Sequence, residues 1–305
     1  MDKRLPPLRQ WLNVKSIKLS SYLVNLAFGY KAVLTRHTLK EVDYSKYLGP
    51  KWRETPFLGK RCSTMVSNHV GFLETTAYID VLTLPPSYLC AEFFKKLPGH
   101  SIVLGLQSIF VDRTSDKAGL EAQVKRLGEI QKERENSEED CNPIIFFAEG
   151  AVTNGRNLTR FKRGPFLAEV AMKPMWFKFN YKNVSADYSC MQALWQGLVQ
   201  LSEFRFNQTI ECHEYPIFVP NEYLFTEYAK TLEGHEKMER WEIYSLAIRD
   251  FIKKEGGFGD NLQSNKDMLS LRKFLWGQTD EITVNGKTFY WPPRGDSAQQ
   301  AKKEQ

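Results

Sequence analysis

The chain has 305 residues, of which 42% are hydrophobic and 26% charged, a composition typical of a soluble globular protein. This length suits one large α/β domain with extensions, or one domain and a half. Five cysteines form no C-x-x-C pair, which favours free thiols in a reducing compartment over a disulfide framework or a zinc site. No apolar run reaches the roughly 18 residues of a spanning helix, so we do not expect the chain to cross a membrane by itself.

The net charge of +6 is concentrated near the N-terminus. Residues 1–40 contain eight Lys or Arg and one acidic residue, whereas the rest of the chain is close to neutral. A nucleic-acid-binding protein would carry a basic face spread over its fold. The charge distribution therefore argues against a nucleic-acid partner and favours a local anionic partner of the N-terminal segment.

Residues 8–35 are predicted to form two helical segments. The first places Trp11 and Leu19 beside Lys15 and Lys18, a pattern typical of a helix lying in a membrane interface. An ordinary helix docked on the domain fits the pattern equally well. A mitochondrial transit segment is a third alternative, because the segment is basic, contains Ser and has almost no acidic residue.

From residue 62 onward, short apolar runs alternate with helical stretches. This alternation predicts an α/β fold with a mixed, mostly parallel sheet flanked by helices. Helices are expected at about residues 71–83, 98–106, 116–135 and 161–172. The predicted strands are Cys62–Ser67, Ser87–Ala91, Ser108–Val111, Ile144–Ala148 and Pro174–Tyr181.

The C-terminal part predicts a different set of elements. Thr209–Glu211 and Ile217–Val219 predict a pair of strands, and residues 221–255 predict helices. Ile282–Tyr290 predicts a hairpin with a type I′ turn at Asn285-Gly286, and the polar tail 295–305 is expected to be disordered when free. Cys212-His213-Glu214 is interpreted as structural, and no metal site is expected there.

The first of these strands ends in a polar corner that contains Asn68 and His69, and the next helix carries Glu74 in its first turn. Residues five apart lie about 140° apart on a regular helix, so His69 and Glu74 can meet only if His69 lies in the corner. A carboxylate on one ring nitrogen would fix the tautomer of His69 and stabilise the imidazolium formed when the other nitrogen accepts a proton. Such a pair corresponds to the His and the carboxylate of a Ser-His-Asp triad, with the hydroxyl supplied by a substrate. A structural hydrogen bond is the alternative.

Two other predicted strands end in polar groups at the edge where such sheets bind ligands. Arg113 follows one of them and can clamp a phosphate through its planar guanidinium; a surface pair with Asp112 is the alternative. Glu149-Gly150 follows the other and leads into a loop with Thr153 and Asn154, which a ligand can approach closely. Four cations come next and favour either a phosphate-bearing ligand or a basic loop facing solvent: Arg156, Arg160, Lys162 and Arg163.

Taken in order, these motifs resemble those of the glycerol-phosphate and lysophospholipid acyltransferase family over about residues 60–220. The similar positions are Asn68-His69 with Glu74, Gly105 with Phe110–Arg113, Phe147–Gly150, and Pro174. The stretch Glu149–Phe166, EGAVTNGRNLTRFKRGPF, resembles the branch that acts on lysophosphatidylcholine and lysophosphatidylethanolamine. That branch has E-G-T-x-T-N-G followed by F-K-x-G-A-F.

The resemblance implies that His69 is the general base. It would deprotonate the glycerol hydroxyl of a lysophospholipid, which attacks an acyl-CoA thioester directly, and Glu74 would orient His69. Acyl-CoA is a co-substrate, and neither a metal nor another cofactor is expected. The implied CoA or phosphate contacts are the four cations after Gly155, and Pro174 would lie near the acyl or CoA channel. The implied acceptor-binding residues are Asn68, Arg113, Glu149, Gly150, Thr153 and Asn154.

Three positions depart from the family pattern. Glu74 replaces Asp and lengthens the reach by about 1.5 Å, Ala148 replaces Pro, and Ala151 replaces Thr. They leave open a second hypothesis, an acyltransferase-fold accessory subunit of a larger membrane complex, for example a mitochondrial one, with reduced or no activity. A hydrolase with a Ser nucleophile is a poorer alternative because no G-x-S-x-G motif occurs.

We therefore predict an acyltransferase of phospholipid biosynthesis with three parts: a basic helical segment at 1–59 that contacts a membrane or partner, an acyltransferase domain at 60–220, and a helical and hairpin extension at 221–305. The expected partners are membrane lipids, lysophospholipid and acyl-CoA, and other protein subunits under the second hypothesis. The expected location is an intracellular membrane, either mitochondrial (inner membrane, matrix side) or of the endoplasmic reticulum.

Overall fold

The computed structural model describes residues 7–59, 61–71, 73–81, 86–92, 108–112, 116–138, 141–182, 185, 187, 193–202, 208–261, 265–284 and 287–290. Several predicted features lie outside these residues. They are the helix at 98–106, Gly105, Arg113, the Asn285-Gly286 turn and the polar tail 295–305.

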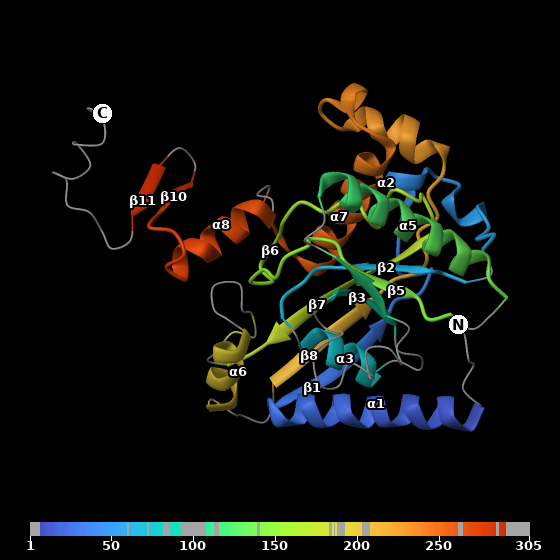
Figure 1. The fold of residues 1–305 in the computed structure, drawn as a ribbon. Coiled ribbons are helices and arrows are strands. Elements are labelled where there is room, and N and C mark those ends of the chain that lie inside the picture. The colour runs from blue at the N-terminus through green and yellow to red at the C-terminus, as the bar shows by residue number, and fades with distance from the viewer. Residues whose placement is uncertain are drawn as a thin grey trace, which may run out of the picture.

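A seven-stranded sheet with the order β1-β8-β7-β2-β5-β3-β4 forms the centre of the protein (Figure 1). Every neighbouring pair is parallel except β7 and β8, which are antiparallel. The predicted fold class, α/β with a mixed and mostly parallel sheet flanked by helices, is confirmed. The strands are β1 (Tyr30–Arg36), β2 (Thr64–Ser67), β3 (Ser87–Ala91), β4 (Ile109–Val111), β5 (Ile144–Phe147), β7 (Met172–Asn180) and β8 (Gln208–Glu214).

Helices cover both faces of this sheet. The helices α1 (Pro7–Ala27) and α3 (Leu73–Val81) lie on one face, and α5 (Lys117–Asn136) and α7 (Arg240–Gly256) lie on the other (Figure 1). Side chains alternate between the two faces of a strand, so adjacent residues belong to the apolar clusters on opposite faces of the sheet. Met65 packs on the side of α1 and α3, whereas Val66 packs on the side of α7. The central strands are accordingly apolar on both faces.

Smaller elements complete the fold. The short strand β6 (Asn157–Leu158) pairs in parallel with β9 (Gly259–Asp260). Strands β10 (Glu281–Val284) and β11 (Lys287–Tyr290) pair in antiparallel fashion, which confirms the two strands of the predicted C-terminal hairpin. The other elements are α2 (Ser45–Leu48), η1 (Trp52–Glu54), α6 (Ala193–Ser202), η3 (Leu224–Tyr228), η4 (Ala229–Thr231), η5 (His235–Lys237) and α8 (Asn265–Leu275).

The prediction of two helices within residues 8–35 is wrong for the second one. Helix α1 ends at Ala27, Gly29 turns the chain with a φ of 75°, and residues 30–36 form β1, which pairs with β8. Tyr30 is buried and alternate residues of β1 are exposed, which suits an edge strand better than a helix. The N-terminal segment therefore contributes an edge strand, β1, to the central sheet.

Two further predictions are wrong. Residues 161–171 form turns instead of a helix, and Glu169 adopts a left-handed φ of 50° that a regular helix excludes. The segment at 217–219 does not pair with β8. It forms an isolated bridge between Phe218 and Met172, because β8 is already paired with β7 and β1.

The C-terminal extension shares a core with the rest of the fold. Tyr244, Ile248 and Phe251 of α7 are fully or almost fully buried and belong to the same apolar cluster as Val66 of β2. Tyr44 also belongs to this cluster. The predicted boundaries at residues 59/60 and 220/221 stay predictions, and side chains on both sides of each boundary contribute to one core.

Candidate active site

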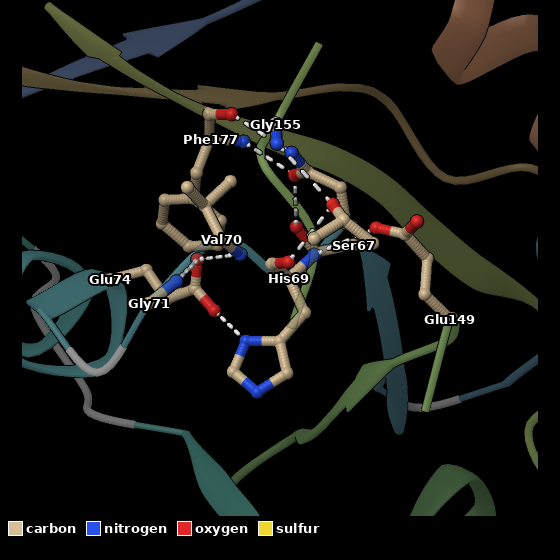
Figure 2. A network of polar contacts seen from close by, with 10 residues as sticks. Ser67, His69, Val70, Gly71, Glu74, Glu149, Gly155 and Phe177 are labelled. Carbon is tan, nitrogen blue, oxygen red and sulfur yellow. Dashed lines mark hydrogen bonds and ion pairs between the residues drawn. The ribbon is translucent and has the colours of Figure 1, made fainter. Parts of the chain in front are cut away.

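His69 and Glu74 meet at the carboxyl end of β2. Strand β2 stops at Ser67, the chain turns through Asn68 and His69, and α3 begins at Leu73. This geometry brings Nδ1 of His69 into hydrogen-bonding contact with Oε1 of Glu74 (Figure 2). The carboxylate of Glu74 is fully buried, whereas the side chain of His69 is 20% exposed. The ring nitrogen that does not face Glu74 points away from the polar network (Figure 2).

Glu74 also organises the backbone of this corner. Its Oε2 accepts hydrogen bonds from the N–H groups of Val70 at 2.9 Å and Gly71 at 3.4 Å. One carboxylate therefore holds both the imidazole and the chain that enters α3. Phe147 supports the other side of His69, with the two rings stacked at a centroid distance of 4.3 Å and an angle of 14°.

Asn68 joins the corner to the neighbouring strand β7. Its amide donates to the carbonyl oxygen of Phe177 at 3.0 Å, and its Oδ1 accepts from the N–H of Phe177 at 2.8 Å. Ser67 donates to the same Oδ1 at 3.1 Å. Asn68 is completely buried, and its hydrogen bonds hold the corner that carries His69 against β7.

Glu149 lies at the end of β5 and is also completely buried. Its Oε1 accepts from the backbone N–H of His69 at 3.0 Å, and its Oε2 accepts from the N–H and the hydroxyl of Thr159 at 2.8 and 2.9 Å. Burial raises the pKa of Glu149, and these hydrogen bonds offset part of that rise. Glu149 thus connects the backbone of His69 to Thr159.

The loop after Glu149-Gly150 closes back onto His69. Thr153 donates its N–H to the carbonyl oxygen of His69 at 2.8 Å, and Gly155 donates to the hydroxyl of Thr153 at 3.3 Å. Gly155 has a φ of 67°, and a Cβ at this position would lie 2.8 Å from Cγ2 of Val70. A larger residue would therefore push the loop away from the corner.

The three departures from the family pattern have different surroundings. Glu74 binds the imidazole of His69 with one carboxylate oxygen and two backbone N–H groups with the other. Ala148 donates its N–H to the carbonyl oxygen of Ser67 at 3.0 Å, a hydrogen bond that Pro could not make. The side chain of Ala151 is partly exposed.

The four predicted cations do not gather in one place. Arg156 lines a groove beside Val70 together with Lys178. Arg163 lines a separate groove along α5 and lies 4.0 Å from the carboxylate of Glu121. Arg160 is exposed and Lys162 is partly buried. The loop therefore contributes one of its four cations, Arg156, to the groove next to the corner.

Two residues of the network could not be found from the sequence motifs. Thr159 binds Glu149, and Arg249 of α7 donates from Nε to the carbonyl oxygen of Thr159 at 2.8 Å. Arg249 is 5% exposed and also binds the carbonyl oxygen of Leu158 and the carboxylate of Asp260. The contact between Arg249 and Thr159 spans 90 positions of the sequence, and no local sequence pattern predicts it.

The described residues offer neither a metal-binding cluster nor a membrane-spanning helix. Within these ranges, no three His, Cys, Asp or Glu side chains are grouped so that they could hold a metal ion. His213 of the Cys212-His213-Glu214 trio contacts His37 at 3.0 Å and stacks on Trp176.

Among the helices that the structure describes, none has the length and apolar character needed to cross a bilayer.

Comparison with known proteins finds similar sequences among curated acyltransferases. No protein-family model matches the sequence, but curated lysophospholipid acyltransferases do. LPEAT1 of Arabidopsis thaliana is 23% identical over 198 residues, covering 65% of this chain and 45% of that protein. LPEAT2 of the same plant is 27% identical over 160 residues, covering 52% of this chain and 28% of that protein.

A third relative is the lysophosphatidylcholine acyltransferase of Drosophila melanogaster, 30% identical over 210 residues, covering 65% of this chain and 35% of that protein. The chain thus spans less than half the length of these three relatives. The resemblance to glycerophospholipid acyltransferases predicted from the motifs is confirmed. A solved structure, the 1-acyl-sn-glycerophosphate (LPA) acyltransferase PlsC from Thermotoga maritima, is 12% identical with a TM-score of 0.43, covering 80% of this chain and 79% of that one.

Proposed function

We propose that this chain is a lysophospholipid acyltransferase that uses acyl-CoA as the acyl donor. The contact between Nδ1 of His69 and the buried carboxylate of Glu74 carries this proposal. It leaves the second ring nitrogen, Nε2, free of Glu74 and pointing out of the network (Figure 2). A histidine held in this way has the tautomer and the orientation that a general base needs.

In the proposed reaction, Nε2 of His69 accepts the proton of a free glycerol hydroxyl as its oxygen attacks the thioester carbonyl carbon. The C–S bond then breaks, and the imidazolium returns the proton to the departing thiolate of CoA. Glu74 stabilises the imidazolium between these two steps, as the carboxylate of a Ser-His-Asp triad does. The thioester is already activated, so proton transfer and positioning are sufficient.

The surrounding residues have supporting roles in this proposal. Glu149 and Thr153 hold the backbone of His69 on both of its peptide groups and keep the loop against the corner. Gly150 and Asn154 belong to the same loop and shape the acceptor side of the site. Arg113, which lies outside the described residues, is proposed to bind the phosphate of the acceptor.

We also propose that the protein works on a membrane surface, because lysophospholipids reside there. Six large apolar side chains on α1 are at least 40% exposed: Trp11, Leu12, Leu19, Tyr22, Leu23 and Leu26. Helix α6 adjoins the end of α1, since Gly197 lies near the ring of Phe28, and it adds exposed Trp195, Leu198 and Leu201. Exposed apolar patches of this kind mark sites of interaction, and a helix with such a face and basic residues suits a bilayer surface.

The test of the proposed reaction is acyl transfer from a labelled acyl-CoA to a panel of lysophospholipids that differ in head group. His69→Ala should lower kcat by about 10²- to 10⁴-fold, the usual contribution of a general base. Glu74→Asp should lower kcat by about ten- to a hundredfold, because the shorter carboxylate cannot hold both the imidazole and the two N–H groups of the corner. Glu74→Gln should be at least as slow.

His235→Ala is the matched control, because His235 is a partly buried histidine in η5 that contacts Glu236 and takes no part in the network. It should retain the wild-type rate. No transfer to any acceptor by a folded, lipid-supplemented wild-type protein would contradict the proposed function. That result would favour the accessory-subunit hypothesis, and the size of the native particle would be measured next.

A further inference from the structure

Tyr88, on β3, is connected to both members of the His69–Glu74 pair. It is 7% exposed and lies beside Ile145 of β5 in the central sheet. It belongs to none of the motifs that carry the family resemblance. Its hydroxyl and its ring make two separate contacts, and each of them leads to one member of the pair.

The hydroxyl of Tyr88 donates to the carbonyl oxygen of Thr75 at 3.1 Å. Thr75 follows Glu74 directly in the first turn of α3. A backbone carbonyl can accept two hydrogen bonds, so this contact ties the turn to β3 without disturbing the helix. Burial raises the pKa of Tyr88 well above its usual value, which keeps the hydroxyl protonated and able to donate at neutral pH. The position of Glu74 therefore depends on β3.

The ring of Tyr88 reaches His69 through Phe147. Tyr88 and Phe147 are stacked with their centroids 6.5 Å apart and their planes at 19°. Phe147 and His69 are stacked at 4.3 Å and 14°. A row of three rings thus connects β3, the end of β5 and the corner after β2. Aromatic pairs favour specific offset geometries, so a displaced Tyr88 would change the surface on which the imidazole rests.

The two contacts converge on one hydrogen bond. Nδ1 of His69 faces Oε1 of Glu74, whose carboxylate is fully buried (Figure 2). The backbone of His69 is held separately, by Glu149. The imidazole, in contrast, has Phe147 on its face and Glu74 at its edge. Tyr88 supports both of these partners.

We propose that Tyr88 is a positioning residue that sets the contact between His69 and Glu74. The inference rests on the proposed function in one respect, that His69 accepts a proton during the reaction. Tyr88 touches no reacting atom, because its ring is buried and its hydroxyl is bound to α3. It acts by holding the carboxylate where it stabilises the imidazolium, and a loosened first turn of α3 makes His69 a weaker base.

The test compares Tyr88→Phe with the wild type, because this variant removes the hydroxyl and keeps the ring stack. NMR of the full chain with labelled histidine follows the titration of the His69 imidazole, whose signal is assigned by its loss in His69→Ala. The titration midpoint should move to lower pH by about 0.3–1 unit in Tyr88→Phe, since part of one hydrogen bond is lost. An unchanged midpoint would overturn the proposal.

Tyr44→Phe is the matched control. Tyr44 is also a buried tyrosine whose hydroxyl donates to a backbone carbonyl, that of Pro216 at 2.8 Å, but it packs in the apolar cluster on the other face of the sheet. Both variants lose one buried hydrogen bond and should lose similar thermal stability. Tyr44→Phe should leave the midpoint of His69 unchanged. Equal shifts in the two variants would assign the effect to general loss of stability and overturn the role of Tyr88.

Steady-state kinetics gives a second readout. The kcat of Tyr88→Phe should fall about three- to tenfold, whereas the KM for acyl-CoA and for lysophospholipid should change less than about twofold, because Tyr88 touches neither substrate. Adding Tyr88→Phe to Glu74→Gln should lower kcat no further, since changes that act through the same contact are not additive. A full additional loss in the double variant would show that Tyr88 acts elsewhere and would contradict the proposal.

Tyr88→Leu removes the ring as well as the hydroxyl. It should lower kcat more than Tyr88→Phe does, because the ring row that ends at His69 loses its first member. Equal effects of the two variants would overturn the route through Phe147. If the wild type shows no turnover, the proposed function fails, and the NMR titration with its Tyr44→Phe control decides the role of Tyr88 by itself.

Discussion

Arg249 donates a hydrogen bond from Nε to the carbonyl oxygen of Thr159 at 2.8 Å, across 90 positions of the sequence. Thr159 in turn donates its N–H and hydroxyl to the buried carboxylate of Glu149, which holds the backbone of His69. A side chain of the C-terminal helix α7 is thus connected to the candidate general base through two hydrogen-bonded residues. The extension beyond residue 220 helps to position the site.

Arg249→Ala should lower the free energy of unfolding by about 3 kcal/mol, because it leaves buried carbonyl oxygens without their donor. Arg249→Lys should cost less, since an ammonium can satisfy one of them. Urea unfolding followed by circular dichroism measures both. Arg126→Ala is the control, because Arg126 is exposed on α5 and its pairs with Glu129 and Glu133 lie at the surface. It should change the free energy by less than about 1 kcal/mol.

Glu149→Gln should have an effect on stability that depends on pH. Burial raises the pKa of Glu149 above its usual value of 4.5. A carboxyl group with a raised pKa in the folded state contributes stability that is fully present below pH 4.5 and is lost as the pH rises through the folded-state pKa. Gln does not titrate, so the wild type should exceed the variant in unfolding free energy by more at about pH 4 than at about pH 7.

Urea unfolding of both proteins at the two pH values measures this difference. An advantage of the wild type that is equal at both pH values, or greater at the higher one, would contradict the predicted sign. Activity should fall in the variant as well, because an amide nitrogen cannot accept the hydrogen bonds that now come from His69 or Thr159.

Gly155→Ala should lower both stability and kcat. The left-handed conformation of Gly155 costs an Ala about 1–2 kcal/mol, and the new methyl group would also lie 2.8 Å from Val70. Gly234→Ala separates the two effects, because Gly234 has a φ of 73° and no atom within 4 Å of its missing Cβ. Gly155→Ala should therefore destabilise the protein more than Gly234→Ala does in thermal melting, and Gly234→Ala should leave kcat unchanged.

The double variant Leu19→Glu/Leu23→Glu should weaken binding to anionic vesicles. These leucines lie one helical turn apart on α1 and are 60% and 52% exposed. Burying a Leu side chain is worth about 1.5–3 kcal/mol, so affinity should fall about tenfold or more. Leu58→Glu/Leu120→Glu is the control with the same charge change, because Leu58, in a loop, and Leu120, on α5, are both exposed away from α1. Equal loss of sedimentation with vesicles in the two variants would show that charge alone is responsible.

The central strands could be predicted because their residues are apolar on both faces. Met65 and Val66, or Ile144 and Ile145, are adjacent residues that are all buried, and a short apolar run of this kind between polar corners is typical of a buried strand. Strand β1 was missed because it is an edge strand with alternate exposed residues, next to a helix of similar composition. The segment 161–171 contains good helix formers such as Leu167 and Ala168, but Gly164-Pro165 within it is a turn signal, and Glu169 has a left-handed φ of 50°.

The His69–Glu74 contact could be predicted because both residues lie within one strand–helix corner, where spacing limits the geometry. The roles of Glu149, Thr159 and Arg249 depend instead on how β5, β6 and α7 pack together. Lys178 is likewise an ordinary residue of β7 in the sequence, and only the folded chain brings it to the same groove as Arg156. Sequence spacing therefore locates the corner, whereas the partners that support it come from distant segments.

Helix α1 is followed by β1 after only a short turn at Phe28 and Gly29, and β1 belongs to the same sheet as β2. If the outer face of α1 rests on a bilayer, no flexible tether separates the membrane from the catalytic corner. The height and tilt of His69 above the lipid are then set by the sheet itself. The enzyme would meet lysophospholipids at one fixed depth, so acceptor choice would depend on how far a glycerol hydroxyl rises from the bilayer as well as on head-group chemistry.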